Sequence, residues 1–327
     1  MAESLAVKYR PKSFDEVIGQ DLTITVLKNT ILHADFKNCL LFVGSAGTGK
    51  TTCARIMAAE INKHKGTPIE IDAASYASAE DIRKLVSECG MRSIDSTYRI
   101  YIIDEVHCLS QQAWQVLLKT LEEPPKYTIF ILCTTEIHKI PATIMSRCQR
   151  YNFNLVPKDV IARRLEEILL QEYEINADLS WDEFVTAELA NMANGGVRDA
   201  IQLLDKCLSY NSRLYVDSVR RCTGTASRAS VITLKQALLA NDILGSHAAL
   251  ETILSSTINV KRIMSQITEY LVESITNSIE IGESSLSNLL ELLSWSVELE
   301  NKIKYSDDPT TVIRAGVYLW FQKHKTS

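Results

Sequence analysis

A stretch near residue 50 has the residue types and the spacing that phosphate chemistry needs. Residues 44–52, "GSAGTGKTT", follow the pattern GxxxxGK[ST] between a short apolar run and a helical pattern. Glycines let such a loop curl until its N–H groups point at phosphate oxygens, and the following helix adds its positive end. Lys50 then places a charge on the β- and γ-phosphates, and the Thr51 hydroxyl is a ligand for Mg²⁺. The predicted nucleotide contacts in this loop are Gly44, Ser45, Ala46, Gly47, Thr48, Gly49, Lys50, Thr51 and Thr52.

Two adjacent carboxylates supply the second half of a nucleotide-hydrolysing site. Asp104 and Glu105 follow the apolar run Ile100–Ile103 in "RIYIIDEVH". We expect Asp104 to hold Mg²⁺ together with Thr51, and Glu105 to polarise the attacking water. Such a pair could also be a solvated turn, but the complete phosphate loop earlier in the chain favours catalysis. The two motifs together predict hydrolysis of ATP or GTP by in-line attack of water.

The elements that must position these groups alternate between strands and helices. Apolar runs predict strands at Cys39–Val43, Ile69–Ile71, Ile100–Ile103, Ile129–Cys133 and, more weakly, Tyr151–Phe153. Helical composition and spacing predict helices at Thr51–Asn62, Ala79–Cys89 and Gln111–Leu121. Strand, helix and strand in repetition predict an α/β fold, with a parallel sheet covered on both faces.

The second half of the chain has a different pattern. From Lys158 onward, apolar residues recur at i, i+3 and i+4, which is typical of amphipathic helices. No strong strand is predicted after Phe153, and the sequence contains no tandem repeat or low-complexity linker. We therefore expect three domains: an α/β nucleotide-binding domain at 1–156, a small helical domain at 157–210 and a larger helical domain at 211–327.

The composition is that of a globular protein, with 46% hydrophobic and 23% charged residues. No run of about 18 apolar residues occurs, so no membrane span or membrane partner is expected. The first residues lack an apolar signal core, so we expect a cytoplasmic protein. The eight cysteines are never closer than 14 positions, which excludes a CxxC zinc site and favours reduced thiols.

The net charge of −5 means that the surface as a whole does not attract nucleic acid. Any DNA contact must then come from a local basic patch. One candidate stretch is 139–164, which has a single acid, Asp159. Its basic residues are Lys139, Arg147, Arg150, Lys158, Arg163 and Arg164.

Seven motifs in a fixed order carry a family resemblance. They are "YRPKSFDEVIGQ" at 9–20, "GSAGTGKTT" at 44–52, "DEVH" at 104–107, "LLKTLEEPP" at 117–125, "CTTE" at 133–136, "SRC" at 146–148 and "GGVRDAIQLLD" at 195–205. The set resembles the sliding-clamp loader ATPases of the AAA+ superfamily, and within them the bacterial DNA polymerase III gamma/tau branch. The resemblance runs from residue 8 to about 205, and the remaining residues are similar only in being helical.

The resemblance implies an AAA+ sheet domain, a helical lid domain and an all-α collar domain used for oligomerisation. It implies ATP and Mg²⁺ as cofactors. The implied partners are a sliding clamp, other loader subunits in a ring-shaped, pentameric assembly, and primer–template DNA. ATP binding is expected to drive clamp opening and DNA binding, and hydrolysis to release the closed clamp on DNA during replication.

The resemblance also assigns roles to individual residues. The adenine pocket is expected from Val7, Lys8, Tyr9, Arg10, Pro11, Val17, Ile18 and Gly19. Thr135 takes the sensor-1 role beside the γ-phosphate, with Thr134 as the alternative, and Arg198 takes the sensor-2 role. Arg147 is expected to be a finger that acts in trans on the ATP of the neighbouring subunit. A guanidinium suits that role because it stays charged and forks onto phosphate oxygens.

The sequence departs from the family pattern in three ways. Bacterial relatives carry a four-cysteine zinc module between the first helix and second strand, but "ARIMAAEINKHKGTPIEIDAAS" runs straight through, so no zinc is expected. We also expect no long extension of the tau form, and a short, zinc-free subunit suggests a bacteriophage or divergent bacterial source. Arg83 matches one DNA-contacting basic residue of relatives, whereas Tyr76 and Ser78 stand where further positive charge is expected.

Two other functions compete with a loader motor. A non-hydrolysing structural subunit of the same assembly is disfavoured by the intact Lys50, Thr51, Asp104 and Glu105. Another AAA+ machine, such as a helicase loader or a branch-migration motor, is disfavoured by the "SRC" motif and the "YRP" opening.

Overall fold

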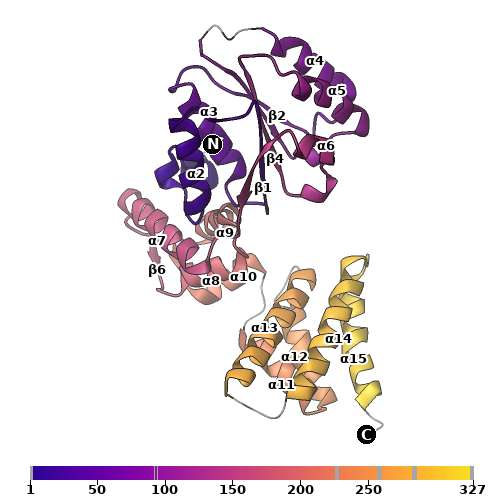
Figure 1. Ribbon diagram of the computed structural model, residues 1–327. Helices are drawn as coiled ribbons and strands as arrows, with labels where there is room; N and C mark the ends of the chain where they lie inside the picture. Colours follow the sequence, from indigo (N-terminus) through magenta and orange to yellow (C-terminus); the bar gives the residue numbers. More distant parts are fainter. Residues whose placement is uncertain are drawn as a thin grey trace. The chain divides into compact units, whose positions relative to one another are not determined.

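The computed structural model describes residues 3–91, 93, 95–224, 228–255, 260–281 and 286–324 (Figure 1). The chain forms two compact units, Met1–Asp205 and Lys206–Ser327. Their boundary falls within helix α9, Val197–Tyr210. The first unit therefore contains the sheet together with most of the helices between residues 157 and 210.

A five-stranded parallel sheet forms the centre of the first unit. Its strands lie in the order β2–β3–β4–β1–β5, and every neighbouring pair is parallel. The strands are β1 Cys39–Gly44, β2 Ile69–Asp72, β3 Arg99–Asp104, β4 Thr128–Thr134 and β5 Gln149–Phe153. All five predicted strands are confirmed. In register, Val43 lies opposite Thr134 and Asp72 opposite Asp104, so the carboxyl ends of the strands share one edge.

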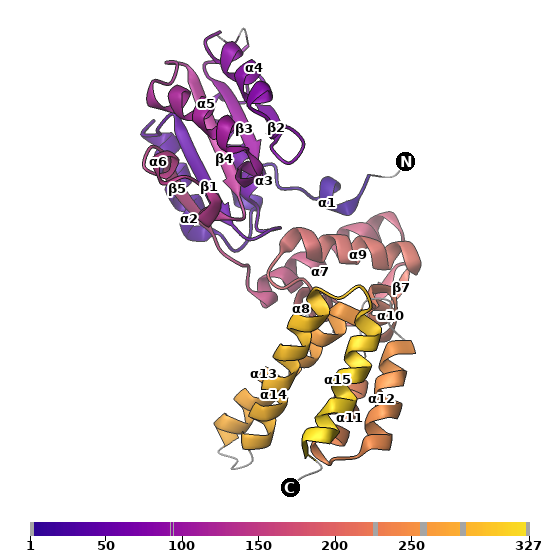
Figure 2. The ribbon, with the colours of Figure 1, turned by 90° about the vertical axis from the view of Figure 1, so that its right-hand side faces the viewer.

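Helices cover both faces of this sheet because side chains alternate between faces along each strand. Leu40 and Phe42 of β1 pack on one face with Met57 of α3, whereas Leu41 packs on the other with Leu117 of α5. Figures 1 and 2 show α2 and α3 on one side of the strands and α4, α5 and α6 on the other. These helices are α2 Asp21–Leu32, α3 Lys50–Ile61, α4 Ala79–Cys89, α5 Gln111–Glu122 and α6 Ala142–Met145.

The amino-terminal segment contacts helices that follow the sheet in the sequence. The Lys8 Nζ atom lies 2.7 Å from a Glu172 carboxylate oxygen, and the Tyr9 hydroxyl donates to the same oxygen across 2.7 Å. The backbone N–H of Leu5 donates to Asp205. Elements of this part are α1 Leu5–Lys8, α7 Lys158–Ile175, β6 Ser180–Trp181, α8 Val185–Met192 and α9, and short 3-10 turns lie at Phe14–Glu16, Val106–Cys108 and Ile137–Lys139. The segment that precedes the sheet thus packs on helices about 160 residues later.

The second unit is helical, as the sequence predicts. Its helices beyond α9 are α10 Val216–Thr223, α11 Arg228–Leu239, α12 Ile243–Ser255, α13 Val260–Ile281, α14 Leu286–Lys304 and α15 Pro309–His324. Leu250, Ile263 and Ile313 are fully buried in its core. A two-residue strand, β7 Arg213–Leu214, also occurs, so that short strands do follow Phe153.

Two further features of the described residues bear on the expected class of protein. No helix among them is long and apolar enough to cross a membrane. All eight cysteines are free thiols, and six of them are buried.

Candidate functional site

The phosphate loop connects the end of β1 to the start of α3, and its glycines are required by the backbone. Gly47 and Gly49 have φ angles of 71° and 100°, in the left-handed region that glycine adopts without steric cost. A Cβ atom on Gly44 would lie 2.3 Å from the carbonyl oxygen of Phe153 in β5. Larger residues at these positions would strain the loop or displace a neighbouring strand.

Lys50 lies inside the curve of this loop. Only 5% of it is exposed, and its Nζ atom donates to the carbonyl oxygens of Gly44 and Ser45 at 2.9 and 2.8 Å. Burial lowers the pKa of Lys50 from its ordinary value of 10.5, because a buried environment disfavours the charged form. A phosphate that enters the loop gives this ammonium group an anionic partner in place of two carbonyl groups.

Thr51 and Asp104 form a direct pair at the edge of the sheet. The Thr51 hydroxyl donates to Oδ2 of Asp104 across 2.7 Å, and Oδ1 accepts from the Glu105 N–H at 3.0 Å. In the described part of the chain, no cluster of three or more His, Cys, Asp and Glu residues could hold a metal ion. Mg²⁺ is commonly held by one or two protein oxygens plus phosphate oxygens, and this pair fits that pattern.

Glu105 belongs to a network of polar side chains from the end of β4 and from the turns that follow β3 and β4. Its φ angle is 45°, a conformation that is uncommon outside glycine and concentrates at functional sites. The Thr135 hydroxyl lies 3.3 Å from Oε2 of Glu105, and His107 Nδ1 lies 3.3 Å from the same atom. His107 also lies 3.1 Å from the Thr134 hydroxyl and 3.1 Å from Glu136. Thr135 therefore contacts the candidate catalytic acid Glu105, while Thr134 contacts His107.

His107 and Glu136 are functional candidates that the sequence interpretation missed. Both lie within motifs that carry the resemblance, "DEVH" and "CTTE", so their positions in the sequence contained a signal. Only the structure shows that strands β3 and β4 bring the two motifs together.

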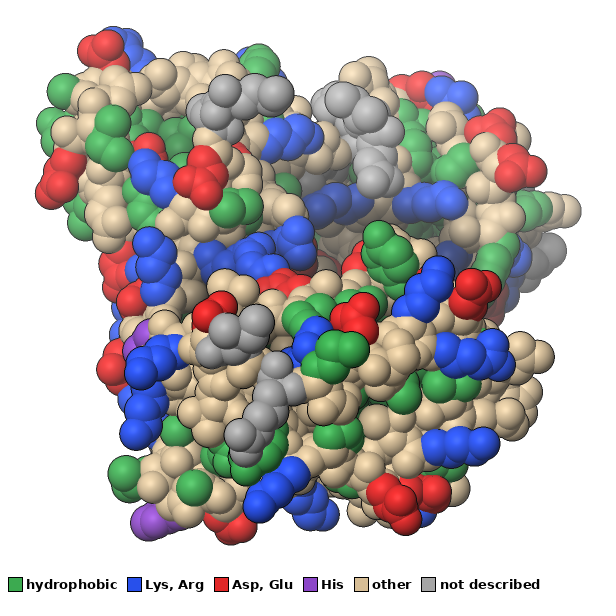
Figure 3. Space-filling model, turned by 90° about the horizontal axis from the view of Figure 1, so that it is seen from above, with side chains coloured by type: hydrophobic (Ala, Val, Ile, Leu, Met, Phe, Trp, Pro, Cys, Tyr) green, Lys and Arg blue, Asp and Glu red, His purple; other side chains and the backbone are tan. Residues whose placement is uncertain are grey.

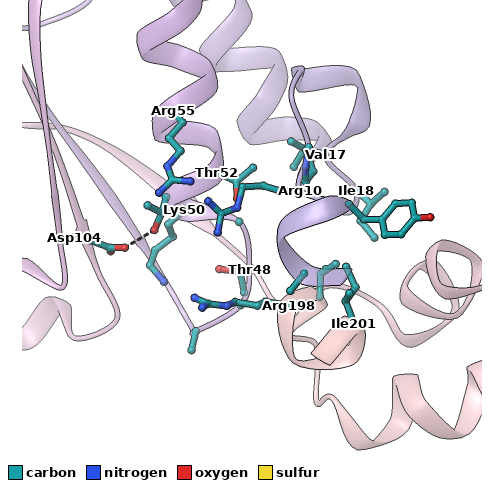
Figure 4. A pocket seen from close by; sticks show the side chains of 18 of the residues that line it. Arg10, Val17, Ile18, Thr48, Lys50, Thr52, Arg55, Asp104, Arg198 and Ile201 are labelled. Atoms are coloured by element: carbon teal, nitrogen blue, oxygen red, sulfur yellow. Dashed lines mark hydrogen bonds between the residues drawn. The ribbon is translucent and has the colours of Figure 1, made fainter. Parts of the chain in front are cut away.

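A pocket of about 370 Å³ lies between the phosphate loop, the amino-terminal segment and the start of α9 (Figure 4). The predicted residues that line it are Tyr9, Arg10, Pro11, Val17, Ile18, Ala46, Gly47, Thr48, Gly49, Lys50, Thr51, Thr52, Asp104, Glu105 and Arg198. The Arg198 N–H donates to the Gly47 carbonyl at 3.4 Å, so α9 begins directly against the loop.

Other predicted residues lie outside this lining. They are Val7, Lys8, Gly19, Gly44, Ser45, Thr135, Arg147 and Arg83. Gly19 has a structural role, because a Cβ atom at this position would lie 2.6 Å from a Val156 methyl carbon. Lys8 contacts Glu172 instead of the pocket.

Four lining residues were not predicted: Ala6, Arg55, Val197 and Ile201. Val197 and Ile201 flank Arg198 at positions −1 and +3, and Arg55 follows Thr51 by one helical turn. Residues at i+3 and i+4 share a helix face, so the helical periodicity of α3 and α9 contained this information.

The pocket has one apolar and one cationic part. Its apolar side chains include Val17, Ile18 and Ile201. Its cations are Arg10, Lys50, Arg55 and Arg198, against the carboxylates of Asp104 and Glu105. Figure 4 shows Arg10, Lys50, Arg55 and Arg198 around the same space. Such a lining suits a ligand with an apolar ring at one end and several negative charges at the other.

Arg147 lies away from its own pocket, after the end of α6. Its Nη2 atom lies 2.8 Å from a Glu122 carboxylate oxygen, and Nη1 donates to the Thr143 carbonyl at 2.7 Å. About a third of the Arg147 side chain (35%) is exposed. The side chain is thus partly accessible from outside the chain.

The basic stretch 139–164 is largely compensated by acids. On the face of the molecule drawn in Figure 3, Lys and Arg side chains lie beside Asp and Glu side chains. Four basic residues of the stretch form ion pairs: Lys139 with Glu136, Arg147 with Glu122, Arg163 with Asp159, and Arg164 with Glu167. These pairs offset part of the positive charge of the stretch. Arg83 is exposed on α4.

Comparison with known proteins identifies related sequences. A family model described as "DNA polymerase III, delta subunit" matches residues 61–157. The tau subunit of DNA polymerase III from Bacillus subtilis is 39% identical over 252 residues, which are 70% of this chain and 44% of that protein. DNA polymerase III gamma subunits from two Buchnera aphidicola subspecies are each 30% identical; the matches cover 82% and 97% of this chain, and 79% and 89% of those proteins.

The chain spans about a third to a half of the length of several longer relatives. The shares are 44% for the Bacillus subtilis tau subunit, 34% for the Haemophilus influenzae tau/gamma subunit and 52% for the Mycoplasma genitalium gamma/tau subunit. These relatives therefore contain segments that have no counterpart in the matched region.

Among solved structures, a similar one is the RuvB Holliday junction branch migration motor of Thermotoga maritima. The TM-score is 0.53 at 21% sequence identity, over 70% of this chain and 79% of that one. At this identity the likeness concerns the fold alone. It confirms the expected AAA+ fold, with a parallel sheet followed by helices.

Proposed function

Because the chain belongs to the DNA polymerase III gamma/tau subunit family, we propose that it is the ATPase motor of a sliding-clamp loader. One observation carries the proposal: the phosphate loop, the Thr51–Asp104 pair, Glu105 and Arg198 meet at a single pocket. A non-hydrolysing structural subunit has no need of the full set. The likeness to RuvB concerns the fold, so it does not favour branch migration.

In the proposed reaction, water attacks the γ-phosphorus of ATP in line, and the bond to the β–γ bridging oxygen breaks. Thr51 and Asp104 would hold Mg²⁺, which neutralises charge on the phosphates when bound. Lys50 contacts the β- and γ-phosphates, and the Glu105 carboxylate orients the water and accepts its proton. Thr135 fixes that carboxylate, at 3.3 Å from Oε2.

The lining of the pocket supports ATP as the ligand class. Val17, Ile18 and Ile201 offer an apolar surface to a base, and the cations Arg10, Arg55 and Arg198 lie around the triphosphate end. The choice of adenine over guanine comes from the family. Arg198, whose N–H contacts the loop at Gly47, senses the phosphates from the helical part of the same unit.

The assembly we propose is a ring of loader subunits. Arg147 gives the most direct test of this assembly. This residue lies outside its own pocket and about a third of its side chain (35%) is exposed, which suits a group that acts on a neighbouring ATP. The proposed partners are a sliding clamp, further loader subunits in a pentameric ring and primer–template DNA. ATP binding opens the clamp and engages DNA, and hydrolysis leaves the closed clamp on DNA.

The test is complementation between two inactive variants. Alone, the chain should hydrolyse ATP poorly, and turnover should rise on assembly with clamp and primed DNA. Arg147→Ala should lower turnover strongly, since arginine fingers contribute about 10³–10⁵ in rate. In rings that mix Arg147→Ala with Lys50→Ala, some interfaces pair an intact pocket with an intact finger, so partial activity should return. Absence of rescue at every ratio, with mixed rings shown to form, contradicts a finger in trans.

A further inference from the structure

Arg147 is held at two of its terminal nitrogen atoms. Nη2 lies 2.8 Å from Oε1 of Glu122, and Nη1 donates to the Thr143 carbonyl oxygen at 2.7 Å. Charge-assisted contacts of an arginine with a carboxylate have a directional geometry. The Glu122 carboxylate on one terminal nitrogen and the Thr143 carbonyl on the other together fix the plane of the guanidinium as well as its position.

Glu122 is attached to a rigid part of the sheet domain. It is the last residue of α5, whose first turn is capped by the Ser110 hydroxyl at the Ala113 N–H, 3.2 Å away. Leu117 is fully buried in the core and Leu121 is 6% exposed. The backbone of Glu122 is therefore fixed, while its side chain is 46% exposed and free to meet the arginine.

The other end of α5 begins six residues after the candidate catalytic acid in the sequence. Glu105 is followed by the 3-10 turn Val106–Cys108, and α5 begins at Gln111. A helix of 12 residues is about 18 Å long at 1.5 Å per residue. Along the chain, the helix thus links the segment that contains Glu105 to the residue that contacts Arg147.

We propose that Glu122 is the positioning residue for Arg147, and that it holds the guanidinium in the orientation in which the neighbouring subunit's ATP meets it. The inference rests on the proposed trans role of Arg147. A free arginine on a short loop samples many rotamers, and most of them point away from a phosphate in another subunit. Because catalytic groups need placement within about 0.5 Å, an anchor on a helix packed into the core turns a partly exposed side chain into a usable finger.

The chain offers a matched control in the adjacent residue. Glu123 has the same chemistry and is exposed, and the ion pair of Arg147 goes to Glu122. Glu122→Gln and Glu123→Gln remove the same charge one residue apart. Exposed ion pairs contribute little to folding stability, so both variants should fold like the wild type. Equal melting temperatures check this point.

The first experiment measures steady-state ATP turnover in the complete assembly with clamp and primed DNA. Glu122→Gln should lower kcat by about 10- to 100-fold, because a misplacement of about 1 Å can cost 100-fold. The KM for ATP and ATP binding by the isolated chain should stay unchanged, since the pocket is intact. Glu122→Asp should recover part of the loss, and Glu123→Gln should match the wild type.

The second experiment locates the defect in the neighbouring site. In rings that mix Glu122→Gln with Lys50→Ala, the Lys50→Ala subunit supplies an intact Glu122–Arg147 pair to a working pocket, so turnover should recover. In rings that mix Glu122→Gln with Arg147→Ala, both fingers are impaired and no recovery is expected. Both mixtures contain the same Glu122→Gln subunit. A difference in turnover between them therefore reports on the arginine that the other subunit supplies.

Several results would overturn the inference. Equal turnover of Glu122→Gln and Glu123→Gln removes the positioning role, and a rise in turnover means that Glu122 restrains the finger. A further contrary result is low turnover in the mixture of Glu122→Gln with Lys50→Ala while the mixture of Arg147→Ala with Lys50→Ala recovers. Glu122 would then act on the pocket of its own subunit. If Arg147→Ala itself keeps full turnover, the proposed finger fails first, and that outcome is distinguishable from the others.

Discussion

The Thr51 hydroxyl donates to the Asp104 carboxylate across 2.7 Å, although the two residues come from different elements. Thr51 lies in the first turn of α3 and Asp104 ends β3. The parallel sheet brings them together because the carboxyl ends of β1 and β3 lie at the same edge. A hydroxyl oxygen and a carboxylate oxygen thus converge beside the phosphate loop, as a Mg²⁺ site shared with phosphates requires.

Thr51→Ala should selectively weaken the magnesium-dependent part of ATP binding. The variant loses one metal contact but keeps Lys50 and the loop, so affinity for ATP without Mg²⁺ should change little. Affinity for ATP with Mg²⁺ should fall about tenfold, the equivalent of about 1.4 kcal/mol. Thr51→Ser keeps the hydroxyl and serves as the control. Titration calorimetry with and without Mg²⁺ measures the affinities of the wild type and both variants. An equal loss of affinity in Thr51→Ala under both conditions contradicts the metal role.

Lys50→Ala should remove most ATP affinity, because the charge on the β- and γ-phosphates is lost. ATP at about 100 times its dissociation constant stabilises a folded protein by about 2.7 kcal/mol, which should vanish in the variant. Thermal unfolding with and without ATP measures the effect. The lowered pKa of Lys50 also predicts how ATP affinity depends on pH. Because the ammonium form binds phosphate, wild-type affinity should fall as pH rises through that pKa. A variant that binds within about threefold of wild type (about 0.7 kcal/mol) refutes the loop assignment.

Glu105→Gln should separate binding from hydrolysis. Glutamine has nearly the same size and can still accept a hydrogen bond, but it cannot accept the proton of the attacking water. ATP binding should be retained and turnover should fall by about 10²–10⁴, the usual contribution of a general base. A stalled complex that retains clamp and DNA is the expected product, detectable by gel filtration. Near-normal turnover would assign the base to another residue and leave Glu105 a structural acid.

The parts of the site that the sequence predicted are those with local causes. The phosphate loop depends on glycines at Gly47 and Gly49, whose left-handed backbone is a property of the residue itself. The strands were recognisable because residues buried on both faces read as continuous apolar runs, such as 39–43. Both signals lie within ten residues of the feature that they predict.

The parts that the sequence could not predict depend on distant contacts. Glu172 binds Lys8 and Tyr9 from more than 160 positions away, and no local pattern marks such a pair. The ion pairs that compensate the basic stretch 139–164 include Glu122, which precedes the stretch and meets Arg147 only through the packing of α5. The charge of a sequence window is therefore a poor guide to the charge of a surface.

The two threonines at the end of β4 should have separable roles, although the sequence left both open for sensor 1. The Thr135 hydroxyl contacts Glu105 at 3.3 Å, whereas the fully buried Thr134 contacts His107 at 3.1 Å and accepts from the Glu136 N–H at 3.0 Å. Thr135→Val should therefore lower single-turnover hydrolysis and leave folding stability near wild type.

Thr134→Val should instead act first on stability. It keeps the shape of the side chain but removes the acceptor of the Glu136 N–H and one of the three polar contacts of His107. An unsatisfied buried polar group costs about 1–3 kcal/mol. Urea denaturation and single-turnover assays on both variants give the comparison. Hydrolysis lost in Thr134→Val at unchanged stability, with Thr135→Val active, would transfer the sensor role to Thr134. We predict the opposite: Thr135→Val loses hydrolysis and Thr134→Val loses stability. Successive residues at the end of a strand point to opposite faces, so only one of the two threonines can reach the catalytic acid.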